Sequence, residues 1–227
     1  MYIKQTIIFN RIEIAGNPSV DHVNVVMRRY SYDETEGIGF TNISVEDGIV
    51  YAKVLLRTPS CIQSYNEADG LLEQKIVNVY AEVEFALDVI QGFLYASTSS
   101  VKFNKAKVLL RKCFEGEIIF RNIDVSPIKI WTKFSRGGYQ PIVTDLSIKK
   151  YAYKEGAIGR FTVHIEEPSI GEDLLVQYSD CINKITMIVM GDSEEKFILT
   201  MTSQNSFAIR CTEEYSEKVI NQLKKLL

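Results

Sequence analysis

The stretches that decide the fold are GFLYASTSSVKFNKAKVLLRKCF, residues 92–114, and NSFAIRCTEEYSEKVINQLKKLL, residues 205–227. Each begins with a short apolar run, passes through polar residues and ends in apolar residues at helical spacing. The second helix also has acidic residues in its first turn and lysines in its last turn, which favours a helix because both signs complement the helix dipole. The pattern predicts a strand followed by an amphipathic helix in each stretch, with helices at about 104–114 and 213–227.

The same two stretches align with each other at a constant offset of 113 residues, which places Lys105 over Lys218. In both, the helix ends one half of the chain. We therefore predict two halves, residues 1–115 and 116–227, which are related by a degenerate internal duplication. Two alternatives stay open: any two strand-to-helix segments can align this well by chance, and the sheets can form one continuous domain.

Outward from these stretches, the chain is rich in β-branched and aromatic residues that alternate with polar ones, as is typical of strands. Residues 58–75 are the exception: they have no clean period and predict a long connection or a short helix. The fold class that we predict is a β-rich α+β protein with two antiparallel-sheet halves, each closed by an amphipathic helix. The predicted strands are Tyr2–Phe9, His22–Tyr32, Gly48–Arg57, Ile76–Leu87, Gln91–Ser97, Glu117–Ile123, Ile128–Phe134, Leu146–Tyr153, Arg160–Glu166, Lys184–Met190, Lys196–Thr202 and Ser206–Cys211.

Composition predicts a folded protein of the cytoplasm. The chain is 46% hydrophobic and 24% charged, close to ordinary globular usage. Charges interrupt its first apolar residues, and no apolar run approaches the roughly 20 residues of a membrane-spanning helix, so we expect neither a signal peptide nor a membrane segment. Cys61, Cys113, Cys181 and Cys211 are far apart in the sequence, and we expect reduced, mostly buried thiols.

Charge is distributed unevenly, although the net charge is −3. Residues 102–160 contain 13 Lys or Arg against 5 Asp or Glu, whereas both flanking segments are acidic. Aromatic residues alternate with these cations, and cations with flat side chains are what single-stranded nucleic-acid binding uses for phosphates and bases. The predicted nucleic-acid-binding residues are Lys129, Trp131, Lys133, Arg136, Tyr139, Lys149 and Lys150.

The strongest local argument for this surface comes from strand alternation in residues 128–134. If these residues form a strand, Lys129, Trp131 and Lys133 share one face, and the tryptophan lies exposed between two lysines. A sheet covered on both faces, with the lysines extending past a buried Trp131, is the alternative.

Catalytic motifs are absent from the sequence. It contains no phosphate-binding glycine loop, no dinucleotide fingerprint, no metalloprotease motif and no nucleophile elbow. Glu82 and Glu84 lie two residues apart on one predicted strand, where a metal-dependent acid–base site is possible in principle but a solvated strand face is more common. We predict no metal site and no cofactor, and leave open whether dispersed residues form a catalytic site.

Three functions follow, in order of preference. The first is a non-catalytic module that contacts single- or double-stranded nucleic acid through the basic centre, as a component of a larger complex. The second is a protein-interaction or scaffold subunit that docks through the same basic surface onto the acidic surface of a partner or of a second copy. The predicted partner-binding residues are Lys105, Arg111 and Lys112, on the outward side of the first helix. The third is a metal-dependent enzyme with dispersed carboxylates.

Overall fold

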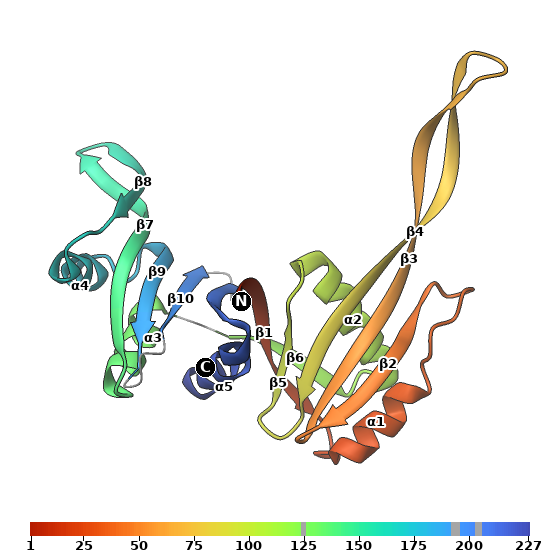
Figure 1. Cartoon of the computed structure of the whole chain (residues 1–227), viewed down its shortest axis with the longest axis horizontal. Coiled ribbons are helices and arrows are strands. Elements are labelled where there is room, and N and C mark those ends of the chain that lie inside the picture. The colour runs from red at the N-terminus through yellow and green to blue at the C-terminus, as the bar shows by residue number, and fades with distance from the viewer. Residues whose placement is uncertain (124–125, 192–195, 203–205) are drawn as a thin grey trace. The chain divides into compact units, whose positions relative to one another are not determined.

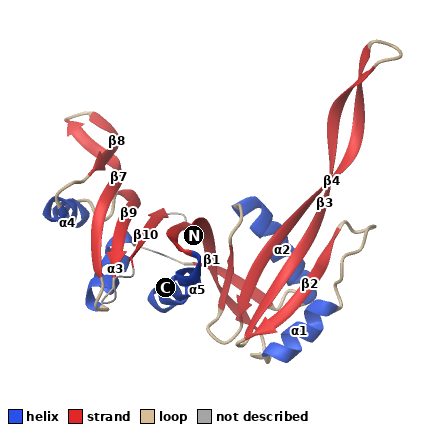
Figure 2. Cartoon of the chain, in the orientation of Figure 1, coloured by secondary structure: helices blue, strands red, loops and turns tan. Residues whose placement is uncertain are grey.

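A computed structural model describes residues 1–123, 126–191, 196–202 and 206–227 (Figures 1 and 2). Its strands pair antiparallel in an open sheet, with helices between them, so the prediction of a β-rich α+β protein is confirmed. The elements are β1 Tyr2–Ile14, α1 Val20–Arg28, β2 Ile38–Glu46, β3 Ile49–Asn66, β4 Leu71–Asp88, β5 Phe93–Ala96, α2 Ser100–Cys113, β6 Ile118–Asn122, α3 Pro127–Arg136, β7 Gln140–Lys154, β8 Ala157–His164, α4 Pro168–Gln177, β9 Ile182–Met190, β10 Lys196–Thr202, β11 Ser206–Thr212 and α5 Glu213–Leu226.

The chain forms two compact units. Unit 1 consists of residues 1–10 and 122–227, and unit 2 consists of residues 11–121. Strand β1 contributes to both, because its first residues pair with β11 and the N–H of Ile12 donates to Gly92 O at 2.9 Å. The predicted division between residues 115 and 116 remains a prediction.

In unit 2, the strand order is β2-β3-β4-β5-β1. Alternate residues of the central strands are buried, as a sheet with one covered face requires. Helices α1 and α2 contact this sheet and each other. The core that they share includes Val23, Met27, Val50, Val54, Leu56, Val83, Phe85, Leu87, Phe103, Leu109 and Leu110.

In unit 1, the strand order is β1-β11-β10-β9-β7-β8. Helices α3, α4 and α5 pack on the same face of the sheet, because the strand residues that they contact, Phe197 and Val143, lie on the same side in the strand register. Phe197 of β10 contacts Phe134 of α3, with ring centroids 5.9 Å apart, and Tyr215 of α5 at 6.1 Å. Gly171 of α4 lies against Val143 of β7. Val143 is paired with Met187, which is fully buried.

Two predicted strands are wrong: residues 22–32 and 128–134 belong mainly to helices α1 and α3. Helix α1 begins at a capping residue, because Ser19 Oγ accepts a hydrogen bond from the N–H of His22 at 3.2 Å. Helix α3 has Pro127 in its first turn, where the missing N–H costs nothing. The buried residues of α3 include Ile130 and Phe134, which are four positions apart. This spacing fits one side of a helix and also one face of a strand, so the short segment was predicted as a strand.

The prediction of a connection or short helix at residues 58–75 is also wrong. These residues form the end of β3, a turn and the start of β4, in a hairpin whose strands are each 18 residues long. Strand β2 and helix α4 were not predicted from the sequence.

All four cysteines are free: Cys113 and Cys211 are buried, Cys181 is partly buried and Cys61 is exposed. Burial raises the pKa of the Cys113 thiol to about 12, which keeps it protonated at neutral pH. Within the described parts of the chain, no helix combines the length and apolar character needed to cross a membrane.

Gly39 of β2 provides a test of this packing. A Cβ at this position would lie 2.3 Å from Tyr32 Cα and 2.5 Å from Ser31 O, both of them backbone atoms that cannot rotate away. We expect Gly39→Ala to lower the free energy of unfolding by about 2 kcal/mol or more. The matched control is Gly159→Ala in β8, where nothing lies within 4 Å; it should change stability by less than about 0.5 kcal/mol in the same urea titration. Equal effects of the two substitutions would contradict the close approach at Gly39.

Candidate functional site

The predicted nucleic-acid-binding residues of segment 129–136 lie on helix α3. Lys129, Lys133 and Arg136 are exposed and spaced at i, i+4 and i+7, so they share one side of the helix. The ammonium group of Lys133 donates a hydrogen bond to the carbonyl oxygen of Leu226 in the last turn of α5. A cation at that position satisfies an otherwise unpaired helix carbonyl, which gives Lys133 a structural role.

The aromatic residues of the predicted site are held by the protein itself. Trp131 is partly buried, and its indole Nε1–H donates to Pro141 O of β7 at 3.1 Å. Tyr139 packs edge-on against Phe134 with ring centroids 5.6 Å apart. The exposed Trp131 expected from strand alternation is therefore wrong, because residues 128–134 are helical.

Lys149 and Lys150 lie elsewhere on unit 1. Both are exposed near an irregularity of β7, where Lys150 has φ 58° and the N–H of Lys149 donates to Cys181 O at 2.7 Å. Pro141, which Trp131 contacts, is eight residues earlier in the same strand, a separation of roughly 25 Å along an extended chain. The fold thus brings together the α3 residues and Tyr139, and leaves this lysine pair apart.

The predicted partner-binding residues of α2 have neighbours within unit 2. Lys105 donates to Thr58 Oγ1 at 3.2 Å, and the guanidinium of Arg111 lies 5.1 Å from the centroid of Phe120. Lys112 forms an ion pair with Glu36, and this pair raises the pKa of Lys112. These surface contacts contribute little stability each.

Glu82 and Glu84, the carboxylates of the enzymatic alternative, share a lysine. The ammonium of Lys53 pairs with Glu84 and lies 3.5 Å from Glu82 Oε1. The two carboxylates therefore flank a protein cation. Within the described ranges, no three His, Cys, Asp or Glu side chains are grouped so that they could hold a metal ion.

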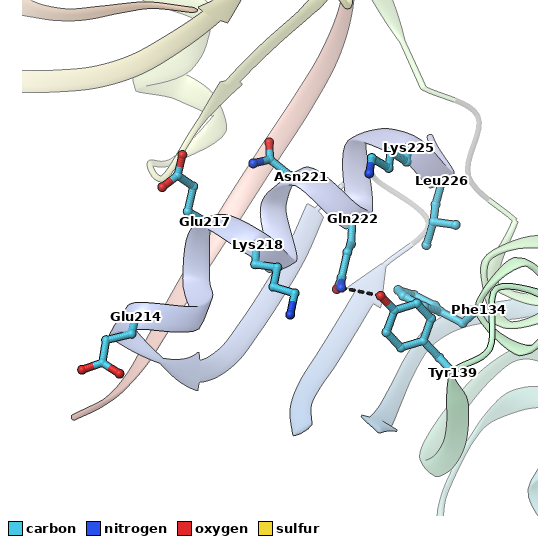
Figure 3. A pocket seen from close by; sticks show the side chains of 9 residues that line it. All are labelled: Phe134, Tyr139, Glu214, Glu217, Lys218, Asn221, Gln222, Lys225 and Leu226. Atoms are coloured by element: carbon cyan, nitrogen blue, oxygen red, sulfur yellow. Dashed lines mark hydrogen bonds between the residues drawn. The ribbon is translucent and has the colours of Figure 1, made fainter. Parts of the chain in front are cut away.

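A pocket of about 570 Å³ lies in unit 1, and Figure 3 shows its lining. Tyr139 and Phe134 face helix α5 across it, and Gln222 donates a hydrogen bond to Tyr139 Oη. The charged residues of its wall are Glu214, Glu217, Lys218 and Lys225. Because both signs are present in equal number, the pocket does not favour an anionic or a cationic ligand.

The opposite face of the unit 1 sheet carries none of the unit's helices among the described residues; we call it the open face. Two rows of paired residues run across it. The first row is Lys4, Arg210, Ile198, Ile188 and Ile142, and the second is Thr6, Ala208, Thr200, Thr186, Asp145 and His164. From β1 to β7 each row spans roughly 19 Å.

Cations dominate the β1 end of the open face. Lys4 and Arg210 are directly opposite each other on β1 and β11, and both are exposed. Neither forms an ion pair with a carboxylate in the part of the chain that the structure describes. Like charges directly opposite each other destabilise a sheet. Tyr2, which is 59% exposed, lies on the same face of β1. Lys184 of β9 and Lys196 of β10 add two exposed cations to the other strands of this face.

At the other end of the second row, His164 Nδ1 lies 3.0 Å from Asp145 Oδ1. The hydrogen bond and the charge of Asp145 raise the pKa of His164. Partial burial raises the pKa of Asp145, but its hydrogen bonds with His164 and Thr144, together with the charges of His164 and Lys184, outweigh burial and the net shift is downward. The histidine therefore adds positive charge to this face when it is protonated.

Sequence reasoning missed the open face because its cations come from distant segments. Lys4 and Arg210 belong to the first and last strands of the chain, and strand alternation shows only that each points to the side opposite its buried neighbours. No protein-family model matches the sequence, and no curated protein is significantly similar to it.

The His164–Asp145 pair predicts a pH dependence. Because the pKa of His164 is raised above 6.5 in the folded protein, the stabilisation from the pair is complete below that value and disappears as pH rises through the folded pKa. Asp145→Asn should lower the pKa of His164, followed by its ring proton resonances in an NMR titration. Glu166→Gln is the control, since Glu166 is a smaller contributor; an equal shift in both variants would contradict the pairing.

Proposed function

We propose that this protein is a non-catalytic binding module that contacts nucleic acid through the open face of unit 1. The observation that carries the proposal is the opposed Lys4–Arg210 pair, which has no carboxylate partner among the described residues and borders a face of threonine and isoleucine. A phosphate between the two cations would convert a repulsion into two charge-assisted hydrogen bonds.

The remainder of the open face suits the other parts of a nucleotide. Ile198, Ile188 and Ile142 form an apolar strip beside the cations, and Thr200 and Thr186 present hydroxyl groups, which hydrogen-bond each other at 3.1 Å. Sugars and base faces can lie on such a strip, while hydroxyls reach base edges or the backbone. Sheets are used in this way by several groups of nucleic-acid-binding proteins.

The α3 residues Lys129 and Arg136 and the lysine pair at 149–150 are proposed as secondary phosphate contacts. They lie on other parts of unit 1, so a long ligand would be needed to reach them and the open face together. We also place the protein in the cytoplasm, a proposal supported by four free cysteines.

We propose further that the two units descend from an internal duplication. The offset of 113 residues maps the bounds of α2 onto those of α5, and β5 onto the start of β11. The strand orders β2-β3-β4-β5-β1 and β7-β9-β10-β11-β1 are also alike. Residue 205, where the second copy of the aligned segment begins, lies outside the described residues.

Lys4→Glu tests the binding proposal, because stability and affinity should change in opposite directions. Replacing a repulsive pair by an attractive one should raise the free energy of unfolding by up to about 1 kcal/mol. Binding of fluorescent single- and double-stranded oligonucleotides, measured by anisotropy at about 0.15 M salt, should weaken about tenfold. The dependence of the affinity on salt concentration should fall by the amount expected for the loss of about one phosphate contact or more.

Lys129→Glu is the matched control, since it makes the same charge change at an exposed residue of α3. With an oligonucleotide too short to reach α3 from the open face, it should leave the affinity close to that of the unmodified protein. If Lys129→Glu abolished binding and Lys4→Glu did not, the interface would lie on α3. If no oligonucleotide bound at low salt, the proposed function would be wrong.

A further inference from the structure

The hairpin of β3 and β4 continues past the rest of the unit 2 sheet. Pairing of β2 with β3 ends at Leu56, and β5 pairs with β4 only from Ala86 onward. Between these limits, residues 57–66 and 71–80 form strand pairs only with each other in the part of the chain described, and we call them the arm. At its base, the N–H of Arg57 also donates to Gly37 O at 2.7 Å. Figure 1 shows the arm as a narrow two-stranded ribbon that extends beyond the other strands of its unit.

The arm exposes far more apolar surface than a solvated hairpin needs. Ile76 is 79% exposed, Leu72 67% and Leu71 65%. Because opposite residues of a hairpin share a face, Tyr65 and Leu72 lie on one face and Asn66 and Leu71 on the other, so both faces carry apolar groups. A two-stranded ribbon alone is only marginally stable in water, and further strands are what stabilise it.

The two outer edges of the arm differ in their capacity to accept a strand. Pro59 interrupts the edge of β3, because proline has no N–H to donate. The edge of β4 contains no proline or glycine from Leu71 to Phe85, and no described strand pairs with it there on the side away from β3. An edge of this length without a proline or bulge is a template for another strand.

The sequence of this edge is complementary to itself. In an antiparallel pair of two β4 strands related by a two-fold axis at Gln74, Glu73 of one copy is opposite Lys75 of the other. The same register places Leu72 opposite Ile76 and Leu71 opposite Val77. Moving the axis to Ile76 instead places Glu73 opposite Val79 and Lys75 opposite Val77, so both charges face valine.

We propose that two copies of this chain pair through their β4 edges, with the two-fold axis at Gln74, to form a four-stranded sheet from two arms. The partner is a second copy because one register joins opposite charges and apolar side chains at once. At the turn, Asn66 already orients the Glu73 carboxylate, since its Nδ2 donates to Glu73 Oε1 at 2.7 Å. This dimer forms without nucleic acid and without the open face.

Charge reversal followed by charge exchange tests the register. Sedimentation equilibrium over a wide range of protein concentration, in the absence of nucleic acid, should show a reversible monomer–dimer equilibrium for the unmodified chain. Lys75→Glu and Glu73→Lys should each weaken dimerisation at least about tenfold. Each variant has like charges at positions 73 and 75, and the two-fold axis places these positions opposite each other at two places in the dimer. The double variant Glu73→Lys/Lys75→Glu should recover the affinity of the unmodified chain.

Thermal unfolding of each variant separates loss of pairing from loss of folding, since the compact body of unit 2 does not contain these side chains. A chain that remains monomeric at every concentration would overturn the proposal, and the edge would then be open to a strand of another protein. A dimer that tolerates both single reversals would equally overturn the assigned register.

Cross-linking tests the position of the two-fold axis independently. In a Cys61→Ser background, which removes the exposed native thiol of the arm, Gln74→Cys should form an intermolecular disulfide on mild oxidation. Asn78→Cys is the control, because this register separates the two copies of residue 78 by eight residue positions. Disulfide formation at position 78 and none at position 74 would contradict the two-fold at Gln74.

Discussion

The packing of helices α3 and α5 on Phe197 determines which side chains unit 1 presents on its open face. Because side chains alternate along a strand, burying Phe197 and Leu199 of β10 against the helices fixes Ile198 and Thr200 on the opposite side. Arg210 is paired with Ile198, and Lys4 is paired with Arg210, so both cations lie on this same side of the sheet. The open face is thus a consequence of how the core is built, and it needs no separate element to form it.

The sequence was informative about most strands and about the helices that follow β5 and β11. It failed at α1 and α3, where apolar residues such as Ile130 and Phe134 suit a period of two as well as one of 3.6. Ser19 as an N-cap residue and Pro127 at the start of the helix were the signals for helix there. The arm was missed for another reason: its strands expose both faces, so no alternation of polar and apolar residues marks them.

The candidate site was less accessible from sequence than the fold. Charge counting selects residues that are close in the chain, and it chose the segment that contains Lys129 and Lys150, which the fold places on separate surfaces. Lys4 and Arg210 meet only because β1 pairs with β11, a long-range register that no local pattern encodes. The Trp131 prediction failed with its strand, since a helix directs the indole N–H to Pro141.

Each proposed surface includes a feature that destabilises the isolated chain. An opposed Lys–Arg pair is repulsive, and a β4 edge from Leu71 to Phe85 leaves backbone groups to water and apolar side chains exposed. Neither feature serves the core, because the covered faces of both sheets are filled without them. A phosphate group would neutralise the repulsion between the two cations. A second strand would pair the backbone groups of the β4 edge and cover its apolar side chains. An anion cannot pair with the backbone edge of the arm, and a strand cannot neutralise the cation pair, so the two proposed surfaces would take different partners and either proposal can hold without the other.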